Sequence, residues 1–270
     1  MKSIYDVNLK SAEGNDYFLD QYKGKVTLLV NTTVGCGNAN QLEVLQWLQE
    51  KYNSEDFEII AIPTNDYCGV GITSGKWAKG ITCGLDSKNY GEEVYGVTFK
   101  YSEMINSCPN DLVSPTVGSA PGHNGLGEPY GEPHELYKLI AEQMINVKEN
   151  KKNLGIKDKS DYISPDLNSG FDNGVQQGGN FEKYLIDRDG YIHKHYHCSV
   201  LNYKVEKTKW EDFGPNGENR IVVGEDGYQF GGGRTMEIFQ EEYALIQKDI
   251  EELINGKSSI INPISENIYA

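Results

Sequence analysis

The chain is poor in cysteine, in positive charge and in long apolar runs. It has 5 Cys among 270 residues, an odd number at low density. That number fits a reducing compartment and a free thiol better than a disulfide framework. The longest apolar run, VTLLV, is too short to span a bilayer, and residues 1–18 lack the apolar core of a secretory signal. We therefore expect a cytoplasmic protein without a membrane segment.

The charge balance narrows the class of partner. Lys and Arg total 25 against 40 Asp and Glu, which gives a formal net charge of −15. Nucleic acids and anionic membranes bind surfaces on which Lys and Arg gather, and this sequence has no basic cluster. We expect neither nucleic acid nor membrane as a partner. The 30 Gly indicate long surface loops in a chain long enough for one large domain or two small ones.

The first 63 residues predict a compact α/β unit. Residues 25–31 and 57–63 are near-continuous apolar runs, typical of strands buried on both faces of a sheet. Residues 41–52 between them have helical apolar spacing, so the three segments form a strand–helix–strand crossover. Residues 4–9 alternate weakly before a turn and predict a short strand or a hairpin arm.

Further elements are separated by irregular stretches. We expect a helix over residues 133–150, and another over 236–255 that ends at Gly256. A β-hairpin is predicted from residues 180–187 and 191–197, because Arg188-Asp189-Gly190 between them is a tight-turn sequence. The Gly- and Asn-rich segments between these elements predict loops without periodicity.

Cys36 is the most informative single position. It follows the end of the first buried strand and precedes the helix, at the sheet edge where α/β proteins gather reactive groups. A thiol near a helix N-terminus is stabilised as thiolate by unpaired backbone N–H groups and the helix dipole. Gly35 and Gly37 leave the sulfur approachable. The alternative is a small buried Cys that packs under the helix.

Six motifs in order resemble the glutathione peroxidase family. They are the opening stretch with YKGKV from residue 22 and NTTVGCG from 31, then FEIIAIPTND from 57, YGVTF from 95, PHELYKLI from 133, NFEKYLIDRDGYIHKHY from 180 and EEYALIQKDIEELI from 241. The resemblance implies a thioredoxin-like α/β fold, with a central mixed sheet flanked by helices. It also implies one domain over 1–256, with insertions at 107–133, 153–178 and 201–234 and a tail at 257–270.

The same resemblance implies oxidoreductase chemistry, although this sequence differs from the family's site at two positions. Cys36 occupies the position of the peroxidatic residue, and Asn180 matches an Asn of the family's site. Asp66 stands where the family has Gln, and Gly179 stands where it has Trp. An ionised Asp66 beside the sulfur would disfavour the thiolate by like-charge repulsion, unless it orients peroxide or relays a proton.

Two further cysteines are candidate resolving thiols under this resemblance. Cys83 lies eight residues before the position at which thioredoxin-dependent members carry a second Cys, and Cys68 follows the second strand. The alternative is that Cys68, Cys83, Cys108 and Cys198 are unrelated structural thiols. A disulfide to Cys36 requires Cα atoms within about 7 Å.

Three alternating histidines and two acidic clusters admit more ordinary interpretations. His193, His195 and His197 share one face of the predicted strand, which could hold Zn²⁺, Ni²⁺ or Cu²⁺. We favour a solvated, partly exposed strand face over a metal site. Glu241-Glu242 and residues 249–252 are interpreted as the wet side of the last helix.

Two functions follow from these observations. The first is a thiol peroxidase, acting in the response to oxidative stress, that reduces hydroperoxides and is itself reduced by glutathione or a thioredoxin-like protein, without a cofactor. The second is a catalytically degenerate scaffold whose long loops contact other chains. In either case we expect a possible homo-oligomer or larger assembly, because the loops have little apolar surface of their own.

Overall fold

The computed structural model describes residues 2–33, 39–52, 56–64, 83–107, 133–153, 181–196, 200–201 and 236–257. The helices are the 3₁₀ turns η1 (Ile4–Asp6) and η2 (Phe18–Tyr22), α1 (Gln41–Lys51), α2 (Gly84–Tyr90), the π-helix η3 (Gly91–Tyr95), α3 (Glu135–Asn153) and α5 (Met236–Ile254). The strands are β1 (Val26–Thr32), β2 (Phe57–Pro63), β3 (Lys100–Tyr101), β4 (Lys183–Ile186) and β5 (Ile192–Tyr196).

The strands form one mixed sheet in the order β3-β2-β1-β4-β5. β1 pairs parallel with β2, and β2 pairs parallel with β3. On the other side of β1, β4 is antiparallel, and β5 returns antiparallel to β4. A strand–helix–strand unit followed by an antiparallel hairpin and a last helix is the thioredoxin-like arrangement, so the predicted fold class is confirmed.

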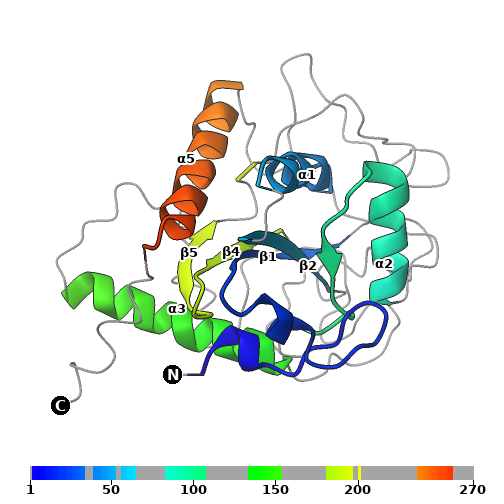
Figure 1. Cartoon of the computed structure of the whole chain (residues 1–270), viewed down its shortest axis with the longest axis horizontal. Coiled ribbons are helices and arrows are strands. Elements are labelled where there is room, and N and C mark those ends of the chain that lie inside the picture. The colour runs from blue at the N-terminus through cyan, green and yellow to red at the C-terminus, as the bar shows by residue number, and fades with distance from the viewer. Residues whose placement is uncertain are drawn as a thin grey trace, which may run out of the picture.

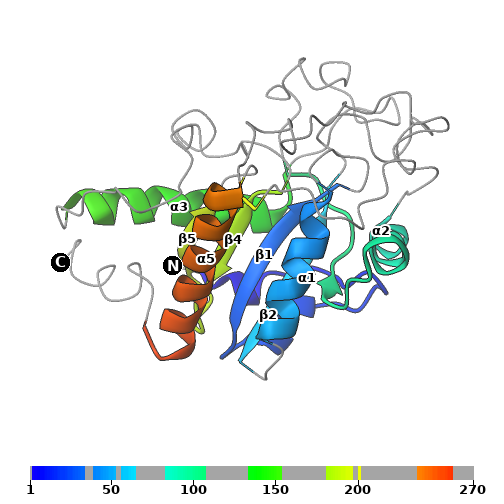
Figure 2. The ribbon, with the colours of Figure 1, turned by 90° about the horizontal axis from the view of Figure 1, so that it is seen from above.

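Helices cover both faces of this sheet (Figures 1 and 2). α1 and α5 lie on one face, whereas η1, η2 and α3 lie on the other, and α2 stands beside the β3 edge. Each face has its own apolar cluster. Leu28 of β1 packs in the cluster with α1 and α5, and its neighbour Leu29 packs in the cluster with α3.

The run 26–32 shows no alternation of buried and exposed residues because both faces of β1 are covered. All seven residues of β1 are buried, the polar Thr27, Asn31 and Thr32 included. Successive side chains of a strand point to opposite faces, so a strand between two helical layers is buried at every position and is mainly apolar. The prediction of buried strands at 25–31 and 57–63 is thereby confirmed.

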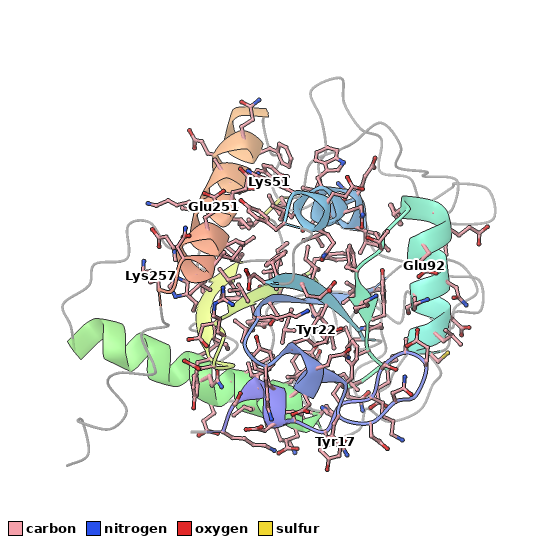
Figure 3. The ribbon with its side chains drawn as sticks, viewed as in Figure 1. Tyr17, Tyr22, Lys51, Glu92, Glu251 and Lys257 are labelled. Carbon is pink, nitrogen blue, oxygen red and sulfur yellow. The ribbon has the colours of Figure 1, made fainter. Side chains whose placement is uncertain are left out.

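α5 begins and ends as its sequence predicts. Gly256 has φ +96°, a left-handed conformation that glycine adopts without a steric penalty. Its N–H donates to Leu253 O at 3.1 Å, and the N–H of Lys257 donates to Glu252 O at 3.0 Å, which closes the last turn. Figure 3 shows Glu251 of α5 near Lys51 of α1, with 3.9 Å between Nζ and Oε1.

The N-terminal segment differs from its prediction. Residues 4–9 are not a strand: η1 forms at Ile4–Asp6, and Ser3 Oγ accepts a hydrogen bond from Tyr5 N at 3.2 Å. Ile4 and Tyr5 are buried beneath the sheet, and Ile4 N donates to Gly190 O at 3.0 Å. Ile4 and Tyr5 therefore pack against the β4–β5 turn, whereas the spacing of apolar residues in this segment suggested an alternating strand.

The acidic residues of α5 are also not uniformly wet. Glu242 and Asp249 are each only 1% exposed. Asp249 accepts hydrogen bonds from Lys194 Nζ and Tyr196 Oη of β5, both at 2.7 Å. These carboxylates are buried because they accept hydrogen bonds from donors outside the helix: Lys194 and Tyr196 of β5, and the backbone N–H of Leu201. The sequence of α5 alone does not reveal this pairing.

The predicted insertions at 107–133, 153–178 and 201–234, apart from their end residues, and the tail from residue 258 lie outside the described residues. Within the described ranges, none of the helices combines the length and the apolar character needed to cross a membrane.

Candidate functional site

The connection that carries Cys36 leaves the sheet where the sequence predicts. β1 ends at Thr32 and α1 begins at Gln41. Cys36 itself lies outside the described residues, as do Asp66, Cys68, Asn180 and His197. The structure therefore shows the anchors of these segments, and their site roles stay predictions.

Two of the anchors are joined directly at the ends of β1 and β2. Thr64 N donates to Thr32 O at 2.9 Å, and Thr33 Oγ1 donates to Thr64 O at 2.6 Å. All three residues are buried. The chain toward Cys36 and the chain toward Asp66 thus start from neighbouring residues.

A third anchor is attached to β1 through Asn31. Phe181 N donates to Asn31 O at 2.8 Å. Glu182 N donates to Asn31 Oδ1 at 2.8 Å, and Asn31 N donates to Glu182 O at 3.1 Å. Asn180 immediately precedes Phe181, so the described residues next to the segments of Cys36, Asp66 and Asn180 meet at one sheet edge.

Phe181 has an unusual backbone conformation at this edge. Its φ is +60° and its side chain is fully buried. A non-glycine residue in the left-handed region costs about 1–3 kcal/mol and persists only where its surroundings enforce it. Lys183, itself buried, donates from Nζ to Phe181 O at 2.8 Å.

Glu182 and His195 form a buried pair beside this strained residue. Their side chains are 0% and 2% exposed, and 2.6 Å separates Glu182 Oε2 from His195 Nε2. The two atoms share one buried hydrogen bond. The imidazole also stacks on Tyr184, with 4.8 Å between ring centroids.

The histidine face of β5 is therefore not the solvated face that we favoured. His193 and His195 are both buried. Burial, reinforced by the Lys194 and Lys257 ammonium groups, lowers the pKa of His193 to about 4. The strand is covered because α3 and α5 close over its two sides, whereas polar alternation in the sequence suggested solvent.

Metal binding by the three histidines stays untested. Among the residues that the structure places, no group of three or more His, Cys, Asp or Glu could hold a metal ion. His195 already hydrogen-bonds Glu182, and His197 lies outside the described part of the chain.

Cys83 is placed, and its surroundings bear on the resolving-thiol prediction. It is exposed and directly precedes α2. Its neighbour Gly84 packs against Ser102, just past β3, so closely that a Cβ would lie 2.2 Å from Ser102 O. β3 is two strands from β1, a lateral distance of about 10 Å. The three residues from Thr33 to Cys36 can span about 10 Å. A Cys36–Cys83 disulfide is therefore within reach of the chain, and it stays a prediction.

A hollow of about 500 Å³ lies elsewhere on the molecule. Nine residues between Ser11 and Tyr22 line it together with Lys88 and Lys100, and Tyr17 and Tyr22 lie on the side of the sheet opposite α1 (Figure 3). It mixes three carboxylates with two lysines. It is separate from the edge at which Thr33, Thr64 and Phe181 meet.

Sequence reasoning missed three residues that shape the candidate site: Asn31, Glu182 and Lys183. One signal was present, because the segment N-F-E-K places two charged residues at the start of a strand whose next residues are apolar. Charged residues at a strand that pairs in the sheet centre need buried partners. The partners themselves come from other strands and are not readable locally.

Comparisons with known proteins cover mainly the first part of the chain. Residues 4–110 match the family model described as glutathione peroxidase. Glutathione peroxidase homolog BsaA of Staphylococcus aureus is 40% identical over 106 residues, which are 39% of this chain and 61% of that protein. A protein of Arabidopsis thaliana named probable glutathione peroxidase 2 is 50% identical over 70 residues, 25% of this chain and 41% of that one. The chain thus spans less than two thirds of these relatives.

Solved structures are similar at low sequence identity. The crystal structure of Trgpx in its apo form is 19% identical, covers 96% of this chain and 99% of its own, and has a TM-score of 0.44. T. cruzi GPX1 is 18% identical, with 74% and 88% covered and a TM-score of 0.38.

Proposed function

We propose that the chain is a thiol peroxidase of the glutathione peroxidase family, whose model residues 4–110 match, with Cys36 as its reactive residue. The observation that carries the proposal is the meeting of three anchors at one sheet edge. The chains toward Cys36, Asp66 and Asn180 leave from Thr33, Thr64 and Phe181, which β1 ties together.

The proposed reaction is a two-electron reduction of a hydroperoxide. The Cys36 thiolate attacks the O–O bond, an S–O bond forms and the O–O bond breaks. Sulfur is oxidised to sulfenic acid, and the departing oxygen takes up a proton to leave as water or alcohol. A first thiol, of glutathione or of a thioredoxin-like protein, then condenses with the sulfenic acid to a disulfide with loss of water. A second thiol displaces the Cys36 thiol and leaves as the oxidised disulfide.

The surrounding groups have distinct proposed roles. Asn180 and backbone N–H groups after Cys36 stabilise the thiolate and the developing oxyanion. The N-terminal end of α1 adds the positive end of its dipole to the same region. Asp66 orients peroxide or relays the proton. Cys83 is the first candidate for the resolving thiol, and Cys68 is the second.

The direct test is peroxide consumption by wild type and Cys36→Ser, with glutathione and thioredoxin supplied in parallel. We expect the Cys36→Ser variant to lose consumption with both reductants. Cys83→Ser is the matched control: it should retain the first oxidation of Cys36 and lose turnover only if Cys83 resolves the sulfenic acid. Consumption by Cys36→Ser at the wild-type rate would overturn the proposal, and a wild type inactive with both reductants would favour a scaffold.

The substitution Asp66→Gln tests the departure from the family's site. If an ionised Asp66 faces the sulfur, its removal favours the thiolate, and we expect peroxide to react with Cys36 about tenfold faster at neutral pH. A pH series of Cys36 alkylation in both proteins measures the thiolate directly. Superimposable curves would show that Asp66 does not act on the sulfur.

We also propose that the chain forms one domain over 1–256, with the insertions at 107–133, 153–178 and 201–234 contacting another copy or another protein. The support is compositional: these segments are rich in Gly and Asn but carry aromatic residues. Sedimentation at micromolar concentration, paired with hydrogen exchange, tests it. A monomer with fast exchange throughout these ranges would exclude the assembly.

A further inference from the structure

Both peptide groups that flank Phe181 are fixed by hydrogen bonds. On the N-terminal side, the backbone N–H of Phe181 donates to Asn31 O at 2.8 Å. After its Cα, Phe181 O accepts from Lys183 Nζ at 2.8 Å, and the N–H of Glu182 donates to Asn31 Oδ1 at 2.8 Å. Two fixed peptide planes determine the backbone angles of the residue between them, which explains the positive φ at a buried aromatic residue.

The side chain of Glu182 fixes the same segment from the opposite side. Its backbone is bound to β1 at Asn31, whereas its carboxylate is bound to β5 at His195. Among the described residues, the β4–β5 ladder includes the pair Lys183 and Tyr196. The Glu182–His195 hydrogen bond adds a side-chain attachment to β5 at the residue that precedes β4.

We infer that the buried Glu182–His195 pair positions Asn180 for the reaction at Cys36. Rotation about the N–Cα bond of Phe181 redirects the chain that precedes it, and Asn180 is the first residue of that chain. By holding Glu182, the pair keeps Phe181 in the one conformation that the three hydrogen bonds to Asn31 and Lys183 define. Glu182 and His195 are thus positioning residues that act through Asn180, and this inference rests on the proposed function.

The molecule contains a matched control for this pair. Asp249 is also a buried carboxylate that accepts from β5, at 2.7 Å from both Lys194 Nζ and Tyr196 Oη. It joins β5 to α5. A general loss of stability would follow from removal of either carboxylate, whereas an effect that depends on Asn180 should follow only from removal of Glu182.

The experiment is a double-mutant cycle between Glu182→Ala and Asn180→Ala in the full chain. Two readouts are taken: the rate of Cys36 oxidation by hydrogen peroxide and the rate of its alkylation by iodoacetamide. We expect Glu182→Ala alone to slow oxidation about tenfold, and to add less than about twofold when Asn180 is already Ala. Glu182→Gln, which keeps an acceptor for His195, should restore most of the rate.

Asp249→Ala is run in the same cycle and should be additive with Asn180→Ala. If Glu182→Ala does not fold, Glu182→Leu combined with His195→Leu removes the hydrogen bond while filling the volume. Additive effects of Glu182 and Asn180 on both readouts, or the same coupling for Asp249, would overturn the inference. A wild type that consumes no peroxide, with coupling retained in the alkylation rate, would refute the proposed function and leave the inference standing.

Discussion

The two ends of the β4–β5 hairpin both contain a residue with positive φ, but they hold it in different ways. At the turn, Gly190 has φ +87°, and Asp187 Oδ1 accepts from Asp189 N at 3.0 Å and from Tyr191 N at 2.9 Å. At the other end, Phe181 has φ +60° and depends on groups from β1, β4 and β5. The positive φ of Gly190 is accommodated by residues of the turn itself, whereas that of Phe181 requires contacts with other strands.

The difference separates what stabilises the fold from what shapes the candidate site. Glycine adopts the left-handed region without a Cβ clash, so the turn needs only its own residues. Phe181 is strained unless Asn31, Glu182 and Lys183 hold it. Strain that persists under such constraint is characteristic of functional positions, and Phe181 lies next to Asn180.

The largest expected effect is on stability at the site end. Glu182→Ala leaves the buried His195 without its hydrogen-bond partner and leaves a cavity, and we expect the free energy of unfolding to fall by about 3–4 kcal/mol. Urea unfolding followed by circular dichroism measures it. The apolar pair Glu182→Leu with His195→Leu should fall by much less, because no polar group remains unpaired. An equal loss in both variants would mean that packing, and not pairing, dominates this end.

His193, between the two ends, should make stability depend on pH. Its pKa is lowered to about 4 in the folded chain by burial, against about 6.5 when unfolded. The unfolded state binds the proton first as pH falls, so stability is full above pH 6.5 and decreases by up to about 3 kcal/mol as pH falls toward 4.

Unfolding measured from pH 7 to 4 in wild type and in His193→Gln tests this expectation. The variant should have a flatter profile over that window. Parallel profiles would show that other groups govern the acid sensitivity.

At the turn, Gly190→Ala should cost about 2 kcal/mol. The positive φ penalises any Cβ by about 1–2 kcal/mol, and the new Cβ would also lie 1.9 Å from Ser3 Oγ, which must move. Thermal unfolding gives the loss, and Cys36 reactivity provides the comparison. The reactivity of Cys36 should be unchanged, because the turn is at the far end of the hairpin from Asn180. A change in that reactivity would show that the turn influences the candidate site.

The smallest expected effect is at the surface of the same turn. Arg188 donates to Gly24 O at 2.7 Å, to Ile254 O at 2.9 Å and to Asp56 Oδ1 at 3.1 Å. These groups are partly exposed, so Arg188→Ala should lower the free energy of unfolding by only about 1 kcal/mol. Urea denaturation in low and high salt separates the ion pair from the carbonyl contacts, since only the ion pair is screened.

Local signals in the sequence were sufficient for most of the fold. The apolar runs at 26–32 and 57–63, the stripe of α5 with its Gly256, and the D-x-D-G turn each encode their structure within a few residues. The segment at Ile4–Asp6 was mistaken for a strand because its burial comes from packing under the β4–β5 turn, which no local pattern records.

The candidate site was predictable only as a location. Cys36 could be placed between a strand and a helix from spacing alone. The burial of His195 could not, because the acceptor that permits it, Glu182, lies on another strand 13 positions earlier. Likewise, Asp249 looks like a solvent-facing residue of a helix until Lys194 and Tyr196 are brought against it by the sheet.

The position of β1 in the centre of the sheet has a consequence for the order of folding. β1 receives β2 from the next segment of the chain, but its other neighbour comes late: Val30 pairs with Lys183, 153 positions further on. Contacts between such distant residues form slowly, because a long loop must close first. During synthesis one edge of β1 stays open until the hairpin emerges, and the hydrogen bonds of Asn31 to Phe181 and Glu182 are among the last that the nascent chain can form. Pulse-labelled hydrogen exchange during refolding should therefore protect β2 and α1 before β4.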